Sequence, residues 1–186
     1  MRVPLLVCAA TLAVGTLAAQ TRDSSFRAIS FGYFATLGTN WQIEAVEIGY
    51  VFRKPRGALP AIAVSTRWGA FIDQSTFLSN TRGMVFAATV SARTRMIQVG
   101  QLGSEDHSSP IGIDLTMEAA GYVAAASPFW QGSRWGAVSM LPSLRIGPGA
   151  LTVGPTLFLA GPKQKPAMRG VLALRGEASL SRPKKR

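Results

Sequence analysis

The residue types that could do chemistry are gathered in one short stretch of the chain, the segment 104–109 with the sequence Ser-Glu-Asp-His-Ser-Ser. It holds the only histidine, His107, beside carboxylates and hydroxyls, which are the side chains of a Ser-His-Asp hydrolase. The members of such a triad must converge in space from rigid elements, whereas a stretch rich in Ser and Asp before Pro110 is typical of a loop. We therefore expect a loop here and no catalytic residue.

The sequence does not predict a metal or cofactor site either. Cys8 is the only cysteine and lies in the N-terminal leader described below, so the mature chain keeps a single histidine and no thiol. Nitrogen and sulfur ligands are the usual ones for a transition metal, and too few are present. No glycine-rich phosphate loop of the P-loop or dinucleotide-binding type occurs. We expect a protein that is not an enzyme and holds no metal and no cofactor.

A second set of reactive side chains is spread along the chain. Ten charged residues lie within strand-like segments, on the same face as small residues: Glu47, Arg67, Arg93, Arg95, Asp114, Glu118, Arg145, Arg169, Arg175 and Glu177. Buried ions are tolerated when they are paired, and the planar guanidinium of Arg can satisfy more than one carboxylate. We expect a lumenal ionic network centred on Arg67, Arg93 and Arg95, which face Asp114 and Glu118. A proton or ion path, or a ligand site, remains the alternative.

In the segments that hold these charges, apolar residues alternate with small or polar residues, with a period of two. In the segment 41–53, one face carries Val46, Ile48, Tyr50 and Phe52, and the other carries Ala45, Glu47, Gly49 and Arg53. The same alternation recurs in the segments 25–39, 59–73, 83–99, 111–123, 135–147, 150–161 and 167–180. Since successive side chains of a strand point to opposite faces, the sequence predicts an all-β fold. We expect a single up-and-down antiparallel β-barrel of about eight strands, with a bulge or a strand end at Pro142 and at Pro155.

The composition of the two faces predicts which one points inward. A soluble barrel buries its apolar face, whereas a membrane barrel turns that face to lipid. The other face consists of Gly, Ala, Ser and Thr with a few ionic residues, which suits a narrow lumen. All five lysines fall in predicted turns or in the tail. Several aromatic residues lie towards strand ends, as in an interfacial girdle, although ordinary packing explains each of them equally well: Tyr33, Trp41, Tyr50, Phe52, Trp68, Phe71, Trp130 and Trp135.

The N-terminus has the features of a secretory signal peptide. One basic residue, Arg2, precedes an apolar run from Val3 to Ala19, which is shorter than the roughly 20 residues of a spanning helix. We expect a signal peptide over residues 1–19 and one barrel domain over residues 20–186, with a short basic tail at 181–186. Despite the net charge of +11, the expected export argues against nucleic acid as a partner. Outer-membrane lipid, with anionic headgroups at the basic turns and tail, is the expected partner, although a merely solvated tail explains those charges as well.

A signal peptide followed by about eight alternating segments resembles the small bacterial outer-membrane β-barrel proteins of the OmpA/OmpX-like class. The resemblance rests on this pattern over the whole mature chain. It implies a monomeric protein integral to the outer membrane, without a wide pore and with a structural or interaction role in the cell envelope. Two alternatives remain: a soluble periplasmic barrel that binds a small apolar ligand, and a lipid A-modifying hydrolase that uses His107.

Overall fold

The computed structural model describes residues 26–38, 41–53, 59–73, 81–104, 108–125, 134–159 and 166–180. They form nine strands: β1 (Phe26–Leu37), β2 (Trp41–Arg53), β3 (Ala61–Asp73), β4 (Thr81–Arg93), β5 (Ile97–Leu102), β6 (Ser109–Ala125), β7 (Arg134–Ile146), β8 (Gly149–Phe158) and β9 (Ala167–Ser179). Several predictions lie outside the described residues, namely those on the signal peptide, His107, Trp130, the five lysines and the basic tail.

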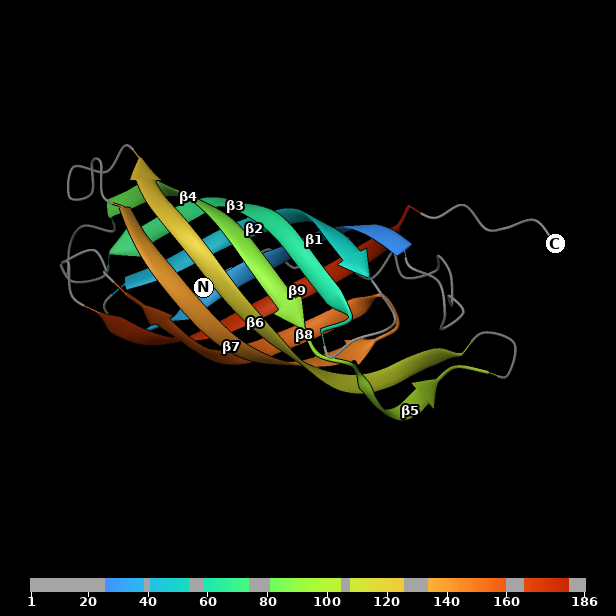
Figure 1. Cartoon of the computed structure of the whole chain (residues 1–186). Coiled ribbons are helices and arrows are strands. Elements are labelled where there is room, and N and C mark those ends of the chain that lie inside the picture. The colour runs from blue at the N-terminus through green and yellow to red at the C-terminus, as the bar shows by residue number, and fades with distance from the viewer. Residues whose placement is uncertain are drawn as a thin grey trace.

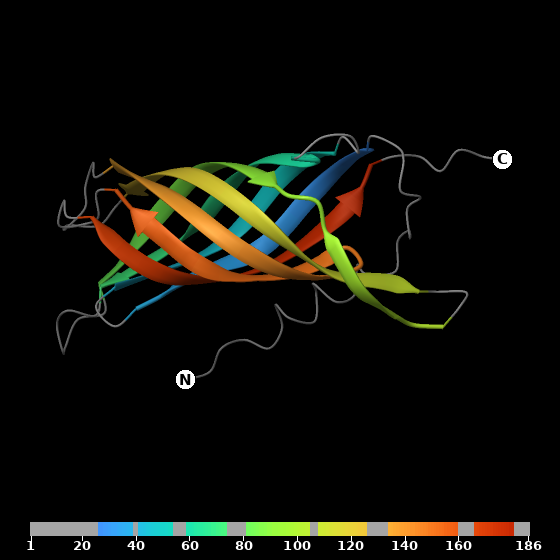
Figure 2. The same ribbon diagram turned by 60° about the horizontal axis from the view of Figure 1, so that its bottom comes forward.

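Eight of the strands close into a barrel (Figure 1). Each strand pairs antiparallel with its neighbour in the order β4-β3-β2-β1-β9-β8-β7-β6, and a direct pairing of β4 with β6 completes the circle. The turned view in Figure 2 shows the strands tilted across the barrel wall. The prediction of an all-β, up-and-down antiparallel barrel of about eight strands is therefore confirmed.

The two-residue alternation orients the side chains of the wall. On β2, Glu47 is buried in the lumen, while its neighbours Val46 and Ile48 point outward with 52% and 49% of their surface exposed. The other barrel strands follow the same rule, with outward Trp68, Val90 and Met140. Small and ionic side chains therefore line much of the interior, together with a buried aromatic and apolar core, and large apolar side chains cover the exterior.

The segment 83–99 is not a single strand, and this part of the prediction is wrong. The ladder of β4 ends at Arg93, residues 94–96 belong to no strand, and β5 begins at Ile97. The long strand β6 pairs with β4 through its second half and with β5 through its first residues. Figure 2 shows the resulting β5–β6 hairpin projecting beyond the barrel wall.

The two strand prolines do not act as predicted. Strands β7 and β8 run through Pro142 and Pro155 without a shift in register, so the structure has neither a bulge nor a strand end there. Instead, the pairing of the two strands stops after Ser139↔Thr156 and resumes at Ser143↔Thr152. A proline has no N–H to donate to a ladder, which explains why the ladder opens while the strands continue.

Candidate functional site

Four ionic side chains meet in the middle of the lumen, and we call them the central cluster: Glu47, Arg67, Glu118 and Arg175. Glu47 on β2 and Arg67 on β3 are direct partners in the β2–β3 register, so the fold sets them side by side. Arg67 Nε donates to Glu47 Oε2 at 2.7 Å, and Arg67 Nη2 donates to Glu118 Oε2 at 2.6 Å. Two arginines thus face two glutamates.

Arg175 completes the central cluster from β9. Its Nη2 donates to Glu118 Oε2 at 2.7 Å, and its Nε lies 3.1 Å from Glu47 Oε1. Arg67 is only 1% exposed, donates from Nη1 to the Tyr122 hydroxyl at 3.0 Å and stacks over the Phe34 ring. Buried charges with partners on several sides are those that a protein interior tolerates, so the central cluster ties β2, β3, β6 and β9 together through the lumen.

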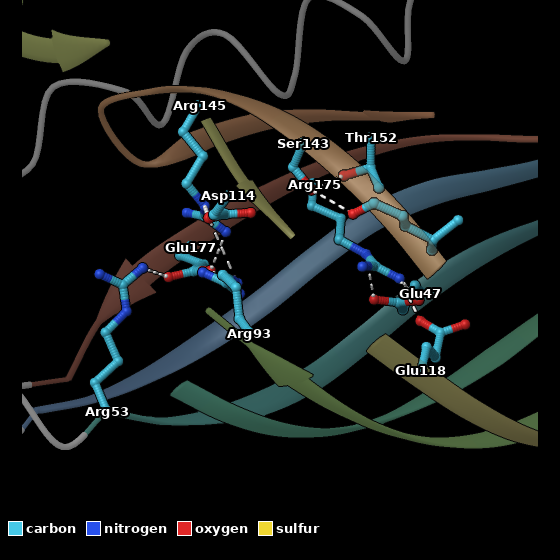
Figure 3. A network of polar contacts seen from close by, with 11 residues as sticks. Glu47, Arg53, Arg93, Asp114, Glu118, Ser143, Arg145, Thr152, Arg175 and Glu177 are labelled. Atoms are coloured by element: carbon cyan, nitrogen blue, oxygen red, sulfur yellow. Dashed lines mark hydrogen bonds and ion pairs between the residues drawn. The ribbon is translucent and has the colours of Figure 1, made fainter. Parts of the chain in front are cut away.

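A second group, the mouth cluster, lies nearer one end of the barrel and consists of Arg53, Arg93, Asp114, Arg145 and Glu177 (Figure 3). Three guanidinium groups converge on the Glu177 carboxylate: Arg53 at 2.5 Å, Arg93 at 2.7 Å and Arg145 at 3.0 Å. Arg145 Nε also donates to Asp114 Oδ2 at 2.5 Å. The chain brings them to one end because β2 and β4 finish at Arg53 and Arg93.

The lumen near the opposite end is aromatic and apolar. Trp41 stacks on Phe71 and meets the edge of Phe158, while Tyr122 lies parallel to Trp135 at 5.6 Å between ring centroids. Phe71 and Trp135 are buried in this core, so packing, and not an interfacial girdle, explains them. The lumen therefore runs from an ionic end to an apolar end.

The ten residues predicted for the network divide into three groups. Eight of them make the ion pairs described above: Glu47, Arg67, Arg93, Asp114, Glu118, Arg145, Arg175 and Glu177. Arg169 lies over the Trp41 ring at 4.6 Å and pairs with no described carboxylate. Arg95 does not belong to the lumen, because it is exposed in the segment 94–96, where the chain has left β4 and the alternation is lost.

The predicted centre of the network also needs correction. Arg67 pairs with Glu118 as expected. Arg93 instead belongs to the mouth cluster, where its Nε lies 4.0 Å from Asp114 Oδ2. Arg95 belongs to neither cluster. Sequence reasoning missed Arg53 and Tyr122, which contact the ionic groups. Both share the face of the small residues in the alternation, so parity alone could have found them.

The described residues hold neither a candidate metal-ligand group nor a membrane-spanning helix. They contain no group of three or more His, Cys, Asp or Glu side chains that could hold a metal ion. No helix among them is long and apolar enough to cross a membrane. No family model, no curated protein and no solved structure matches the chain. The function is therefore inferred from the geometry of the barrel itself.

Proposed function

We propose that the protein is an integral β-barrel of the bacterial outer membrane, with a structural or interaction role in the cell envelope and no catalytic role. The observation that carries this proposal is the outward position of the large apolar side chains. Outward residues in the middle of the strands, such as Ile48, Val64 and Val90, are about half exposed, and so are their counterparts on other strands. Lipid tails are the solvent that suits such a surface.

The distribution of outward charges supports the same proposal. Among residues whose burial is described, the exposed charged side chains are Arg27, Glu44, Arg95 and Arg134. Arg27 and Arg134 lie at or next to a strand end, Arg95 follows β4, and Glu44 is the fourth residue of β2. A membrane barrel carries an uncharged band around its middle, with polar residues towards the two interfaces. The exterior fits such a band.

The alternative of a soluble ligand-binding barrel meets two difficulties. A soluble monomer rarely exposes a continuous apolar patch larger than a few hundred Å². The outer wall instead combines apolar residues from every barrel strand, including a shallow groove lined by Met117, Met140 and Met168. A binder of apolar ligands also needs an apolar cavity, whereas ion pairs of the central cluster occupy the middle of the described lumen.

Cell fractionation tests the proposal most directly. The protein is expressed in a Gram-negative host, and the membranes are washed with alkaline carbonate, which removes peripheral proteins. We expect it to stay in the outer-membrane fraction and to migrate differently on gels before and after boiling, because a closed barrel resists detergent without heat. Release by osmotic shock together with soluble periplasmic proteins would refute the membrane location.

A further inference from the structure

The β5–β6 hairpin carries unusually exposed apolar side chains. Ile97, Val99 and Leu102 on β5 are 71%, 61% and 57% exposed, whereas Ile48 in the middle of the barrel wall is 49% exposed. The hairpin projects beyond the wall (Figure 2), so less of the protein covers these side chains. Apolar surface in water is unfavourable, and we therefore expect this part of the hairpin to meet an apolar partner.

The apolar face of the hairpin continues the outer face of the barrel wall. Ile97 pairs with Ile113 on β6, and side chains of directly paired residues lie on the same face of a sheet. The register carries this row on to Leu144 on β7 and Leu151 on β8, and both side chains are outward and exposed. A partner that covers the outer wall therefore reaches the hairpin without a break.

The other face of β5 is polar. Gln98 pairs with Gly112 and Gln101 pairs with Pro110, so both glutamines alternate with the outward positions of the strand. Edge strands that lie in water are commonly protected by charged side chains, and the sequence of β5 contains none. One apolar face and one uncharged polar face are the pattern of an element that lies at the surface of a membrane.

The backbone of β5 limits how deep the hairpin can lie. In the part of the chain that the structure describes, β5 pairs with β6 alone, so its second edge faces no other strand. Hydrocarbon does not tolerate an open sheet edge, whereas the headgroup layer contains water that can bond to it. A strand of a second copy would cover this edge but leave the apolar face of the hairpin open. The boundary between headgroups and acyl chains suits both features.

We propose that the β5–β6 hairpin lies in the headgroup layer of the membrane, with Ile97 and Val99 inserted among the acyl chains. This inference rests on the proposed membrane location and assigns the hairpin a lipid surface as its partner. Two hydrogen bonds hold the corner between β4 and β5 on the wall: Thr94 N donates to Leu115 O at 2.9 Å, and Leu115 N donates to Thr94 Oγ1 at 3.0 Å. The inserted hairpin therefore helps to set the depth of the barrel.

Spin labelling in vesicles of phosphatidylcholine and phosphatidylglycerol tests the depth of the hairpin. Cys8 is the only cysteine, so a Cys8→Ser background carries one nitroxide label at a chosen position. Collisions of the label with oxygen, which is enriched in lipid, and with a water-soluble nickel chelate measure its depth. We expect the label of Ile97→Cys to lie about 5–10 Å into the boundary between headgroups and acyl chains, the depth of other interfacial elements.

Two control labels separate this inference from the membrane location. Gln101→Cys, an exposed position on the other face of β5, is expected to meet the nickel chelate more often than oxygen. Ile48→Cys, in the middle of β2, is expected to lie deeper in lipid than the label of Ile97→Cys.

The outcomes are distinguishable. An Ile48→Cys label in lipid with an Ile97→Cys label in water overturns the inference and leaves the membrane location standing. An Ile97→Cys label shielded from both reagents also overturns it, because protein, such as a second copy, then covers the hairpin. An Ile48→Cys label in water overturns the membrane location and the inference together. Should Ile97→Cys fail to assemble, Val99→Cys takes its place, since that side chain is also exposed.

Discussion

Arg67 and Glu118 meet inside the barrel, with 2.6 Å between Nη2 and Oε2, although their strands β3 and β6 are not neighbours in the wall. Strand β4 lies between them and pairs with both. The ion pair therefore joins β3 to β6, two strands that share no backbone hydrogen bonds. Because Arg67 also pairs with Glu47 on β2, a single side chain links three strands through the lumen.

Arg67→Met is expected to destabilise the barrel by about 3–5 kcal/mol, the usual cost of breaking a buried ion pair from one side. The substitution leaves Glu47 and Glu118 facing Arg175 alone, so the central cluster gains an unbalanced negative charge. Urea unfolding of the protein in lipid vesicles, analysed by linear extrapolation, measures the loss.

The double variant Arg67→Met with Glu118→Gln is the control for charge balance. It leaves Arg175 paired with Glu47, and we expect it to regain a substantial part of the stability lost in the single variant. Arg27→Met, at an exposed position, should change stability by no more than about 0.5 kcal/mol. Equal stability of Arg67→Met and wild type would contradict the role given to the central cluster.

The membrane proposal predicts that the stability lost on introducing an outward arginine depends on the depth of that residue in the bilayer. Ile48 lies in the middle of β2 and Leu37 at the end of β1, and their exposed fractions are nearly equal at 49% and 52%. In a bilayer, Ile48→Arg is expected to cost about 2–4 kcal/mol and Leu37→Arg about 0–1 kcal/mol, since an arginine near the interface reaches water. Unfolding of the two variants in the same lipid vesicles provides the comparison.

For a barrel that normally lies in water, Ile48→Arg and Leu37→Arg are expected to have a different effect on stability. Both residues are outward and half exposed, so both arginine variants would then leave the stability of the protein almost unchanged. Equal and small effects would thus count against the membrane proposal, independently of cell fractionation.

The faces of the barrel wall could be predicted from the sequence because each residue's position within a strand decides its face. Val46, Glu47 and Ile48 alternate in polarity along the chain and alternate between exterior and lumen in the structure. The same rule failed after Arg93, since the polarity of the sequence still alternates over residues 94–96, but these residues belong to no strand and no longer alternate between lumen and exterior. A pattern of polarity does not report where backbone pairing stops, and this explains the error at Arg95.

The partners within the lumen could not be predicted in the same way. Glu47 and Arg67 sit on adjacent strands and share a register position, which hairpin pairing makes predictable. Glu177 and Arg53 are 124 residues apart and belong to strands that β1 separates. Which inward side chains meet across a barrel depends on the tilt and stagger of all its strands, and no single segment of the sequence contains that information.

Hydrogen exchange should distinguish β5 from the barrel wall. In the described structure β5 pairs with β6 alone, and its register is interrupted between Gln98 and Gly100, whereas β4 pairs on both sides. Amides of residues 97–102 are expected to exchange at least about tenfold faster than those of residues 85–91, because opening the edge strand leaves the closed barrel intact. Equal protection of the two strands would show that β5 is covered on its second edge.

Gly69 is expected to be indispensable to the packing of β3 against β2. A Cβ atom placed there would collide with the Glu44 carbonyl oxygen and with Ala45, and backbone atoms of a closed sheet cannot easily retreat. Gly69→Ala should therefore cost at least about 1–3 kcal/mol through overpacking. The matched control is Gly121→Ala on β6, where a Cβ atom meets nothing within 4 Å, and we expect it to be neutral or slightly stabilising. Urea midpoints of both variants decide the comparison, and a stable Gly69→Ala barrel would mean that β2 and β3 are less closely packed than the structure shows.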